Sequence, residues 1–265
     1  MEIKTISPEI GDDIYLEFGF GLPGGPRAIL STLAAGNMKF DPSGGNQARE
    51  RFIAGRGIER ARLRPLSLKH TRRVIFQERG ESMAHLQEAA DALGGADGLV
   101  VEDPVSIPAL TVADCMPIWL YDARREVFGL LHSGWKGTGI LAEAVLGMTA
   151  RFGSRPDDIS AILGPSIGAC CYAVPEERSL AFGAEFGKES VRAVRANSEE
   201  GTDPEEGAVS FRIDLRAANI NLAESLGIGN LLDVRLCTSC SPTLGSFRRQ
   251  GAAGFTRMLA LCGYF

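Results

Sequence analysis

Short apolar runs rich in branched residues recur along the chain, a pattern that predicts β-strands. Four of these runs occupy residues 28–32, 74–76, 98–101 and 107–112. Two more, at 117–121 and 127–132, flank a short polar stretch and predict a β-hairpin. Further strands are predicted at 231–237 and 255–261.

Helical spacing of apolar residues follows the hairpin. It extends from Ile140 to Met148, after the sequence S-G-W-K-G-T-G, and Gly153 ends it. A second helix is predicted to begin near Asp214, whose carboxylate suits an N-terminal cap, and to end at Gly227. Strands and helices interleave, but the hairpins exclude a purely parallel sheet. We therefore expect an α+β fold with mixed β-sheets flanked by helices.

The breaks between these segments are short. Stretches rich in glycine and proline at 21–26 and 41–46, and an acidic run at 197–207, are typical of loops rather than of a long linker. No internal repeat is visible. A length of 265 residues suits one large domain or two small ones, and because the breaks look like loops we expect residues 1–265 to form a single domain.

The composition is that of an ordinary globular protein, with 45% hydrophobic and 23% charged residues. No stretch approaches the roughly 20 apolar residues of a membrane span, and the N-terminus lacks the apolar segment of a secretory signal. We therefore expect a soluble, cytoplasmic protein with no membrane partner. A net charge of -5 argues against a nucleic-acid partner, although it leaves room for a small basic pocket that binds an anion.

The chain has six cysteines and three histidines, too few cysteines for a disulfide scaffold of this length. Cys115 and His132 lie at the two outer ends of the predicted hairpin, and antiparallel pairing would bring them together. Zinc favours such a mixture of thiolate and imidazole, and three protein ligands leave one position open for chemistry. His70 is the third candidate ligand, whereas His85 is predicted on a surface helix. On spacing alone, Cys115 and His132 also fit a role as ordinary core residues.

Several motifs carry a family resemblance. In order, they are A-D-G-L-V, T-V-A-D-C-M-P-I-W-L, L-L-H-S-G-W-K-G-T, I-L-G-P-S-I-G-A-C-C-Y, C-T and S-F-R-R. They resemble the YfiH family, often labelled polyphenol oxidase or laccase-domain, which includes purine nucleoside phosphorylases with adenosine deaminase activity. The resemblance implies one unit with mixed sheets and a zinc ion held by His70, Cys115 and His132. The chain departs from the family pattern at Leu68, where glutamine is common, at Ala173 in place of glutamate, and in L-G-S-F-R-R in place of F-F-S-Y-R-R.

The resemblance also implies an activity. We expect phosphorolysis of adenosine, inosine, guanosine and methylthioadenosine to base and sugar 1-phosphate, with hydrolytic deamination of adenosine. Asp114, inside the A-D-C motif, joins the three ligands as a catalytic candidate. A laccase needs roughly ten imidazoles for its coppers, so three histidines argue against copper despite the label. The cytidine-deaminase signature H-x-E is also absent, because Arg72, Gln87 and Gly134 stand two places after the histidines.

Phosphorolysis needs an anion subsite. The candidates are Lys136, near a predicted helix start, and the pair Arg248 and Arg249 in S-F-R-R. Gly164 and Gly168 are expected to let a glycine-rich loop approach the substrate closely.

Two other functions stay open at this stage. Cys115 and His132 also suit the nucleophile and base of a cysteine hydrolase, and a zinc-containing module that only binds purines would need no catalysis. The expected assembly is a monomer or a small homo-oligomer. The vicinal pair Cys170 and Cys171 is predicted to pack under the glycine-rich loop, while C-T-S-C, with Cys237 and Cys240, suits either a metal or a redox role.

Overall fold

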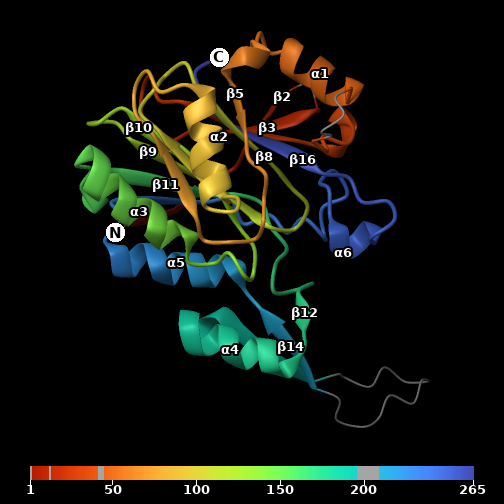
Figure 1. The fold of residues 1–265 in the computed structure, drawn as a ribbon. Helices are drawn as coiled ribbons and strands as arrows, with labels where there is room; N and C mark the ends of the chain where they lie inside the picture. The colour runs from red at the N-terminus through yellow and green to blue at the C-terminus, as the bar shows by residue number, and fades with distance from the viewer. Residues whose placement is uncertain (1, 12, 41–44, 196–208) are drawn as a thin grey trace.

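Two mixed β-sheets stacked on each other form the centre of the molecule (Figure 1). The computed structural model describes residues 2–11, 13–40, 45–195 and 209–265. The first sheet has seven strands in the order β1 (Glu2–Thr5), β15 (Asn230–Asp233), β11 (Ile159–Leu163), β9 (Met116–Asp122), β10 (Val127–Ser133), β7 (Gly98–Val101) and β6 (Val74–Gln77). The second has six, in the order β2 (Glu9–Gly11), β3 (Tyr15–Phe18), β4 (Arg27–Ser31), β16 (Met258–Gly263), β8 (Ile107–Val112) and β5 (Leu63–Pro65).

Both sheets combine parallel and antiparallel pairs. In the first sheet, β15 pairs in parallel with β1 and β11, while β9 is antiparallel to β11 and β10. The inner faces of the two sheets share an apolar core, in which the rings of Phe18 and Trp119 lie 5.2 Å apart. The buried Trp119 also donates from its indole N–H to the carbonyl of Leu261 in the opposite sheet at 2.8 Å. The expected α+β fold with mixed sheets is confirmed.

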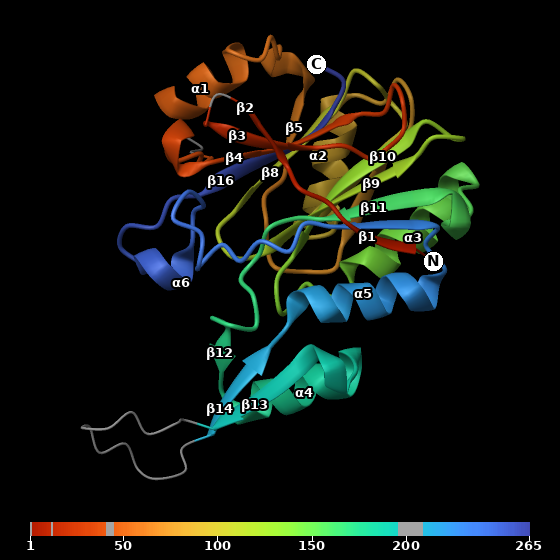
Figure 2. The ribbon, with the colours of Figure 1, turned by 180° about the vertical axis from the view of Figure 1, so that it is seen from behind.

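Helices cover the outer faces of this sandwich (Figures 1 and 2). Helices α3 (Ile140–Phe152) and α5 (Leu215–Leu226) pack on the seven-stranded sheet, and α1 (Gln47–Ala54) packs on the six-stranded one. Helix α2 (Met83–Ala92) lies beside β6. A small sheet of β12 (Ala173–Val174), β14 (Val209–Ile213) and β13 (Val191–Arg195) carries α4 (Glu176–Phe186), and α6 (Phe247–Gln250) is a single turn. Four 3-10 turns occupy Leu33–Ala35, Arg60–Arg62, Pro156–Asp158 and Lys188–Ser190.

Local sequence explains where the two predicted helices begin and end. Helix α3 ends at Gly153, whose positive φ of 67° lets its N–H reach the carbonyls of Met148 and Thr149. Helix α5 begins after Asp214, whose carboxylate accepts a hydrogen bond from the N–H of Ala217. Both helices and the first six predicted strands match the structure to within one residue at each end.

Two predicted strands differ from the structure. The segment 231–237 is extended only as far as Asp233, because the chain leaves the sheet at Arg235, where φ is +44°. The segment 255–261 is shifted, since β16 begins at Met258 and Phe255 instead packs on Phe247 beside a cavity. The acidic run at 197–207, and residues 41–44 of the loop at 41–46, lie outside the described residues. Within the described part of the chain, no helix is both long and apolar enough to span a bilayer.

The sheet topology gathers several strand ends at one edge of the sandwich. Strand β9 begins there and its antiparallel neighbour β10 ends there. The parallel strands β11 and β15 also end there. The loops connected to these strand ends are therefore neighbours in space, although they are far apart in the sequence.

Candidate functional site

His70, Cys115 and His132 meet at this edge, and we refer to them as the His–Cys–His group. Cys115 directly precedes β9, and His132 stands opposite Pro117 near the end of β10, so antiparallel pairing places the two side by side. His70 reaches them from the loop before β6, with its ring 5.0 Å from that of His132. The potential ligand atoms of the three residues all lie within 4.8 Å of one another. The structure thus brings together the three predicted ligands.

The buried carboxylate of Asp97 organises two of these residues. It accepts a hydrogen bond from His132 Nδ1 at 2.9 Å, and from the backbone N–H groups of Lys69, His70 and Thr71 at 3.1, 2.9 and 2.8 Å. The hydroxyl of Thr71 donates to it as well, at 2.9 Å. Burial by itself would raise the pKa of the Asp97 carboxyl, but the bonds from His132 and Thr71 lower that pKa to about 2. These bonds also hold His70 in the left-handed backbone region, at a φ of 57°.

The thiol of Cys115 and the imidazole of His132 shift each other's pKa. Burial raises the pKa of the Cys115 thiol, yet the charge of His132 and hydrogen bonds from both imidazoles lower it to about 6. Burial lowers the pKa of His132, whereas Cys115 and Asp97 raise it to about 9. Because His132 Nδ1 faces Asp97, its Nε2 is the ring nitrogen left for a ligand. A thiolate with oriented imidazoles is a donor set that suits a borderline-soft metal ion.

Gly134 makes room for the thiol. A Cβ atom at this position would lie 2.7 Å from Cys115 Sγ and 3.8 Å from Cδ2 of His70. The glycine of H-S-G-W is therefore required by the close approach of the backbone to the His–Cys–His group.

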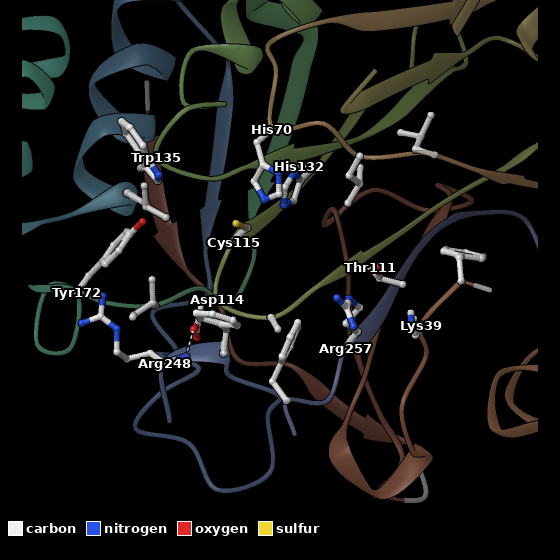
Figure 3. A pocket seen from close by; sticks show the side chains of 18 of the residues that line it. Lys39, His70, Thr111, Asp114, Cys115, His132, Trp135, Tyr172, Arg248 and Arg257 are labelled. Atoms are coloured by element: carbon white, nitrogen blue, oxygen red, sulfur yellow. Dashed lines mark hydrogen bonds between the residues drawn. The ribbon is translucent and has the colours of Figure 1, made fainter. Parts of the chain in front are cut away.

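A cavity of about 680 Å³ opens in front of the group (Figure 3). This volume falls in the range of small-molecule sites. Aromatic side chains on its wall are Phe40, Trp135, Tyr172, Phe247 and Phe255, and cationic ones are Lys39, Arg178, Arg248 and Arg257. Figure 3 places Arg248 on one side of the group and Lys39 and Arg257 on the other. Trp135 lies on the same side as Arg248 in Figure 3, and the guanidinium of Arg178 is 4.3 Å from the centre of the Trp135 ring. Arg178 therefore lies on the Arg248 side of the cavity.

Asp114 holds part of the cavity wall in place. Its carboxylate accepts hydrogen bonds from the hydroxyl of Thr238 and from the backbone N–H of Arg248, both at 2.7 Å. Its own backbone has a φ of +87°, and its carbonyl accepts from Ile167 at 2.8 Å. The guanidinium of Arg248 donates to the carbonyls of Cys171 and Ala173 at 3.3 and 3.0 Å. Asp114 therefore positions Arg248, and both of its carboxylate oxygens already accept hydrogen bonds from the protein.

Two predicted phosphate ligands do not reach the cavity. Lys136 is exposed and is not among the lining residues, and its ammonium lies 5.3 Å from the ring of Trp135. Arg249 donates instead to backbone carbonyls, those of Thr238, Ser239, Ser241 and Leu244. Of the three candidates, only Arg248 lines the cavity.

The glycines of the loop after β11 contact protein rather than the cavity. A Cβ at Gly164 would lie 2.5 Å from the ring of Trp119, and one at Gly168 would lie 3.3 Å from Cβ of Cys237. The predicted close approach to substrate stays a prediction. The close approaches in the structure are to other side chains, because the loop packs against β9 and against the loop after β15.

Several residues of the site were not identified from the sequence. Asp97 had a usable signal, an acidic residue in A-D-G directly before a buried strand. Lys39, Arg178 and Arg257 had none, because each is an ordinary surface-type cation brought in by a separate element. Leu68, the departure from the family glutamine, also lines the cavity.

The expectation that Cys170 and Cys171 are packing residues under a glycine-rich loop holds only for Cys171, which packs against the apolar core. Cys170 is exposed and Cys171 is half-buried, and their thiols lie close to those of Cys237 and Cys240. The tertiary structure therefore supplies the partners that C-T-S-C lacked in the sequence.

Comparison with known proteins gives one family and several relatives. The sequence model described as "Multi-copper polyphenol oxidoreductase laccase" matches residues 33–264. Among curated proteins, the chain is 30% identical over 195 residues to "Purine nucleoside phosphorylase YlmD" of Bacillus subtilis, covering 72% of this chain and 66% of the relative. It is 34% identical over 188 residues to "Adenosine deaminase RL5" of an unknown prokaryotic organism, covering 69% and 68%.

A solved structure agrees with this assignment. The crystal structure of YlmD from Geobacillus stearothermophilus superimposes with a TM-score of 0.74 at 26% identity, covering 94% of this chain and 95% of that one. The residues that the family model matches include all three members of the His–Cys–His group and every strand from β5 onward. The chain therefore belongs to the YfiH family, whose sequence model carries the laccase description.

Proposed function

We propose that this chain is a zinc-dependent purine nucleoside enzyme that cleaves nucleosides by phosphorolysis and deaminates adenosine hydrolytically. The observation that carries the proposal is the position of the His–Cys–His group in the wall of a cavity of about 680 Å³ that also presents aromatic and cationic side chains. The names of the curated relatives support the same class of substrate.

Zinc fits the donor set better than the copper of the family label. Two imidazoles and one thiolate are typical zinc ligands, and three protein ligands leave a position open. A multicopper oxidase would need roughly ten imidazoles, but the chain has three histidines, and His85 is exposed on α2, 3.3 Å from Glu81. A bound zinc ion would supply a Lewis acid and lower the pKa of a bound water molecule toward neutrality.

The Arg178–Arg248 side of the cavity is the proposed phosphate subsite. A phosphate dianion in a protein of net charge -5 needs local positive charge, and guanidinium groups bind phosphate oxygens with two parallel hydrogen bonds. Tyr172 and Trp135 flank these arginines at ring distances of 5.6 and 4.3 Å. In phosphorolysis, a phosphate oxygen bonds to C1′ as the C1′–N9 bond breaks, and the departing purine takes up a proton.

The aromatic rings provide the purine-binding surface. Phe247 and Phe255 stand edge to face, 5.0 Å apart, and Arg257 lies 4.2 Å from the ring of Phe255. A flat heterocycle gains both apolar burial and stacking against such rings. In deamination, the oxygen of a water molecule bonds to C6 and ammonia leaves, a reaction that needs no phosphate. Adenosine, inosine, guanosine and methylthioadenosine are the proposed substrates.

A cysteine hydrolase is a second candidate, and one specific arrangement favours it. Asp97 hydrogen-bonds to His132, and His132 lies beside Cys115, which is the order of orienting group, base and nucleophile in such enzymes. A zinc-bound thiolate is a weak nucleophile, so metal occupancy separates the two functions.

Turnover by metal-analysed protein tests the proposal. The purified chain is incubated with each of the four nucleosides, with and without phosphate, and the products are separated by chromatography. We expect free base and sugar 1-phosphate only with phosphate, and inosine from adenosine in both conditions. His132→Ala should abolish both reactions, while His85→Ala, on the exposed face of α2, serves as the matched control. Absence of base and inosine in every condition would overturn the purine assignment, and activity that survives complete zinc removal but not thiol alkylation would favour the hydrolase.

A further inference from the structure

The loops that follow β11 and β15 form a second group of potential metal ligands. These two strands are parallel neighbours, so their loops leave the sheet at the same edge. The loops then run side by side, with Ser166 bridged to Cys237, and the N–H of Thr238 donating to the carbonyl of Ser166 at 3.0 Å. The first loop carries Cys170 and Cys171, and the second carries Cys237 and Cys240. We refer to these four residues as the four-cysteine cluster.

The spacing of the thiols fits a single tetrahedral ion. All four Sγ atoms lie within 4.8 Å of one another, and Cys240 Sγ is 3.6 Å from that of Cys170 and 3.4 Å from that of Cys171. Zinc–sulfur bonds of roughly 2.3 Å in a tetrahedron place sulfur atoms about 3.8 Å apart. A disulfide would require a separation of about 2.05 Å.

A backbone N–H group of the first loop points at a sulfur atom of the second. The N–H of Gly168 donates to Cys237 Sγ at 3.2 Å. Four thiolates around one divalent cation carry a net charge of about −2, which nearby cations would balance.

Three arginines bind the backbone of the two loops. Arg212 donates to the carbonyls of Ala169 and Cys170, and Arg248 donates to that of Cys171. Arg249 donates to several carbonyls of the C-T-S-C loop and its neighbours, as described above. Positive charge is therefore concentrated next to the thiols, and both loops are held in position.

We propose that the four-cysteine cluster is a structural zinc site, separate from the His–Cys–His group. Four protein ligands close the coordination sphere of zinc, so this site has no open position for substrate. Its role is to tie together two loops that form one wall of the cavity. One loop leads to Tyr172, and the other bonds through Thr238 to Asp114, which positions Arg248.

Metal stoichiometry of the full chain, purified under reducing conditions, tests the site. We expect about two zinc ions per chain in the unaltered protein. His132→Ala should retain about one, and X-ray absorption should show it bound by about four sulfur atoms at roughly 2.3 Å. Cys240→Ser, a substitution at an exposed position, should lose that ion and retain the one bound by nitrogen and sulfur. Ser239→Ala is the matched control inside the same loop and should keep both.

The His132→Ala measurement leaves all four cysteines in place, so it does not depend on the folding of a cysteine variant. Cobalt(II) exchanged into this variant should give the strong thiolate charge-transfer absorption of a tetrathiolate site. One zinc per chain in the unaltered protein, lost entirely in His132→Ala, would overturn the proposal. A disulfide among the four cysteines in protein prepared with reductant would also overturn it. These outcomes concern metal content and the oxidation state of the thiols, so they are independent of the proposed nucleoside activity.

Discussion

The carboxylate of Asp97 accepts a hydrogen bond from His132 Nδ1 at 2.9 Å, and the same carboxylate fixes the loop that carries His70. One buried acidic side chain thus positions two of the three candidate ligands. Such carboxylate–histidine pairs orient the imidazole and select its tautomer at metal sites. The two ligands are coupled through Asp97 rather than through direct contact of their backbones.

Replacing Asp97 by asparagine should weaken zinc binding while preserving the shape of the side chain. The amide cannot accept all of the hydrogen bonds that the carboxylate accepts, and loss of a group of this kind typically costs about 10- to 100-fold in metal affinity. Competition with a chromophoric chelator measures the change. Asp91→Asn, on the exposed side of α2, is the control and should bind zinc normally. Equal affinities for the two variants would show that Asp97 does not act on the metal site.

Gly134→Ala should disrupt the His–Cys–His group without unfolding the chain. The added methyl group would lie 2.7 Å from Cys115 Sγ, so the thiol must move away from the position that it shares with His132. We expect loss of zinc and of both nucleoside activities, with an unchanged circular dichroism spectrum. Gly254→Ala is the matched control, since a Cβ there meets nothing within 4 Å. Full zinc content in Gly134→Ala would contradict the steric argument.

Arg248→Ala should impair phosphorolysis more than deamination. A charged hydrogen bond is worth roughly 1.5–3 kcal/mol, so the KM for phosphate should rise by about tenfold to a hundredfold. Deamination uses no phosphate and should fall much less. Initial rates of both reactions against phosphate concentration measure the split, and Lys136→Ala, outside the cavity, is the control. An unchanged phosphate KM in both Arg248→Ala and Arg178→Ala would place the anion elsewhere, for example beside Lys39 and Arg257.

Arg249→Ala should lower stability rather than phosphate affinity. Its guanidinium holds the carbonyls of the C-T-S-C loop, and it does not line the cavity. Because Arg249 is exposed, we expect a cost of only about 1–2 kcal/mol, which corresponds to a fall in Tm of roughly 2–8 °C. Calorimetry of matched Arg248→Ala and Arg249→Ala samples checks this. A raised phosphate KM in Arg249→Ala with an unchanged Tm would reverse the assignments of the two arginines.

The sequence by itself determined the helices and strands that depend on interactions between residues close together in the chain. Apolar periodicity and the flanking glycines predicted α3 and α5, and the polar stretch between two apolar runs predicted the β9–β10 hairpin. The proximity of Cys115 and His132 followed from that hairpin, because antiparallel pairing across a short turn brings the outer ends of the two strands together. The sequence also offered His70 as a third candidate, but only the family resemblance joined it to the other two as a ligand.

Only the tertiary structure decided which distant groups share a site. Asp97 reaches His132 because β7 pairs with β10, and the four cysteines converge because β11 pairs in parallel with β15 across a long crossover. Arg248 and Arg249 are consecutive residues of one motif, yet only Arg248 lines the cavity. Their directions depend on where α6 is held by Asp114 and on which carbonyls lie nearby. These contacts form between segments that are distant in the sequence, and no short-range pattern predicts them. The sequence therefore could not distinguish the roles of the two arginines.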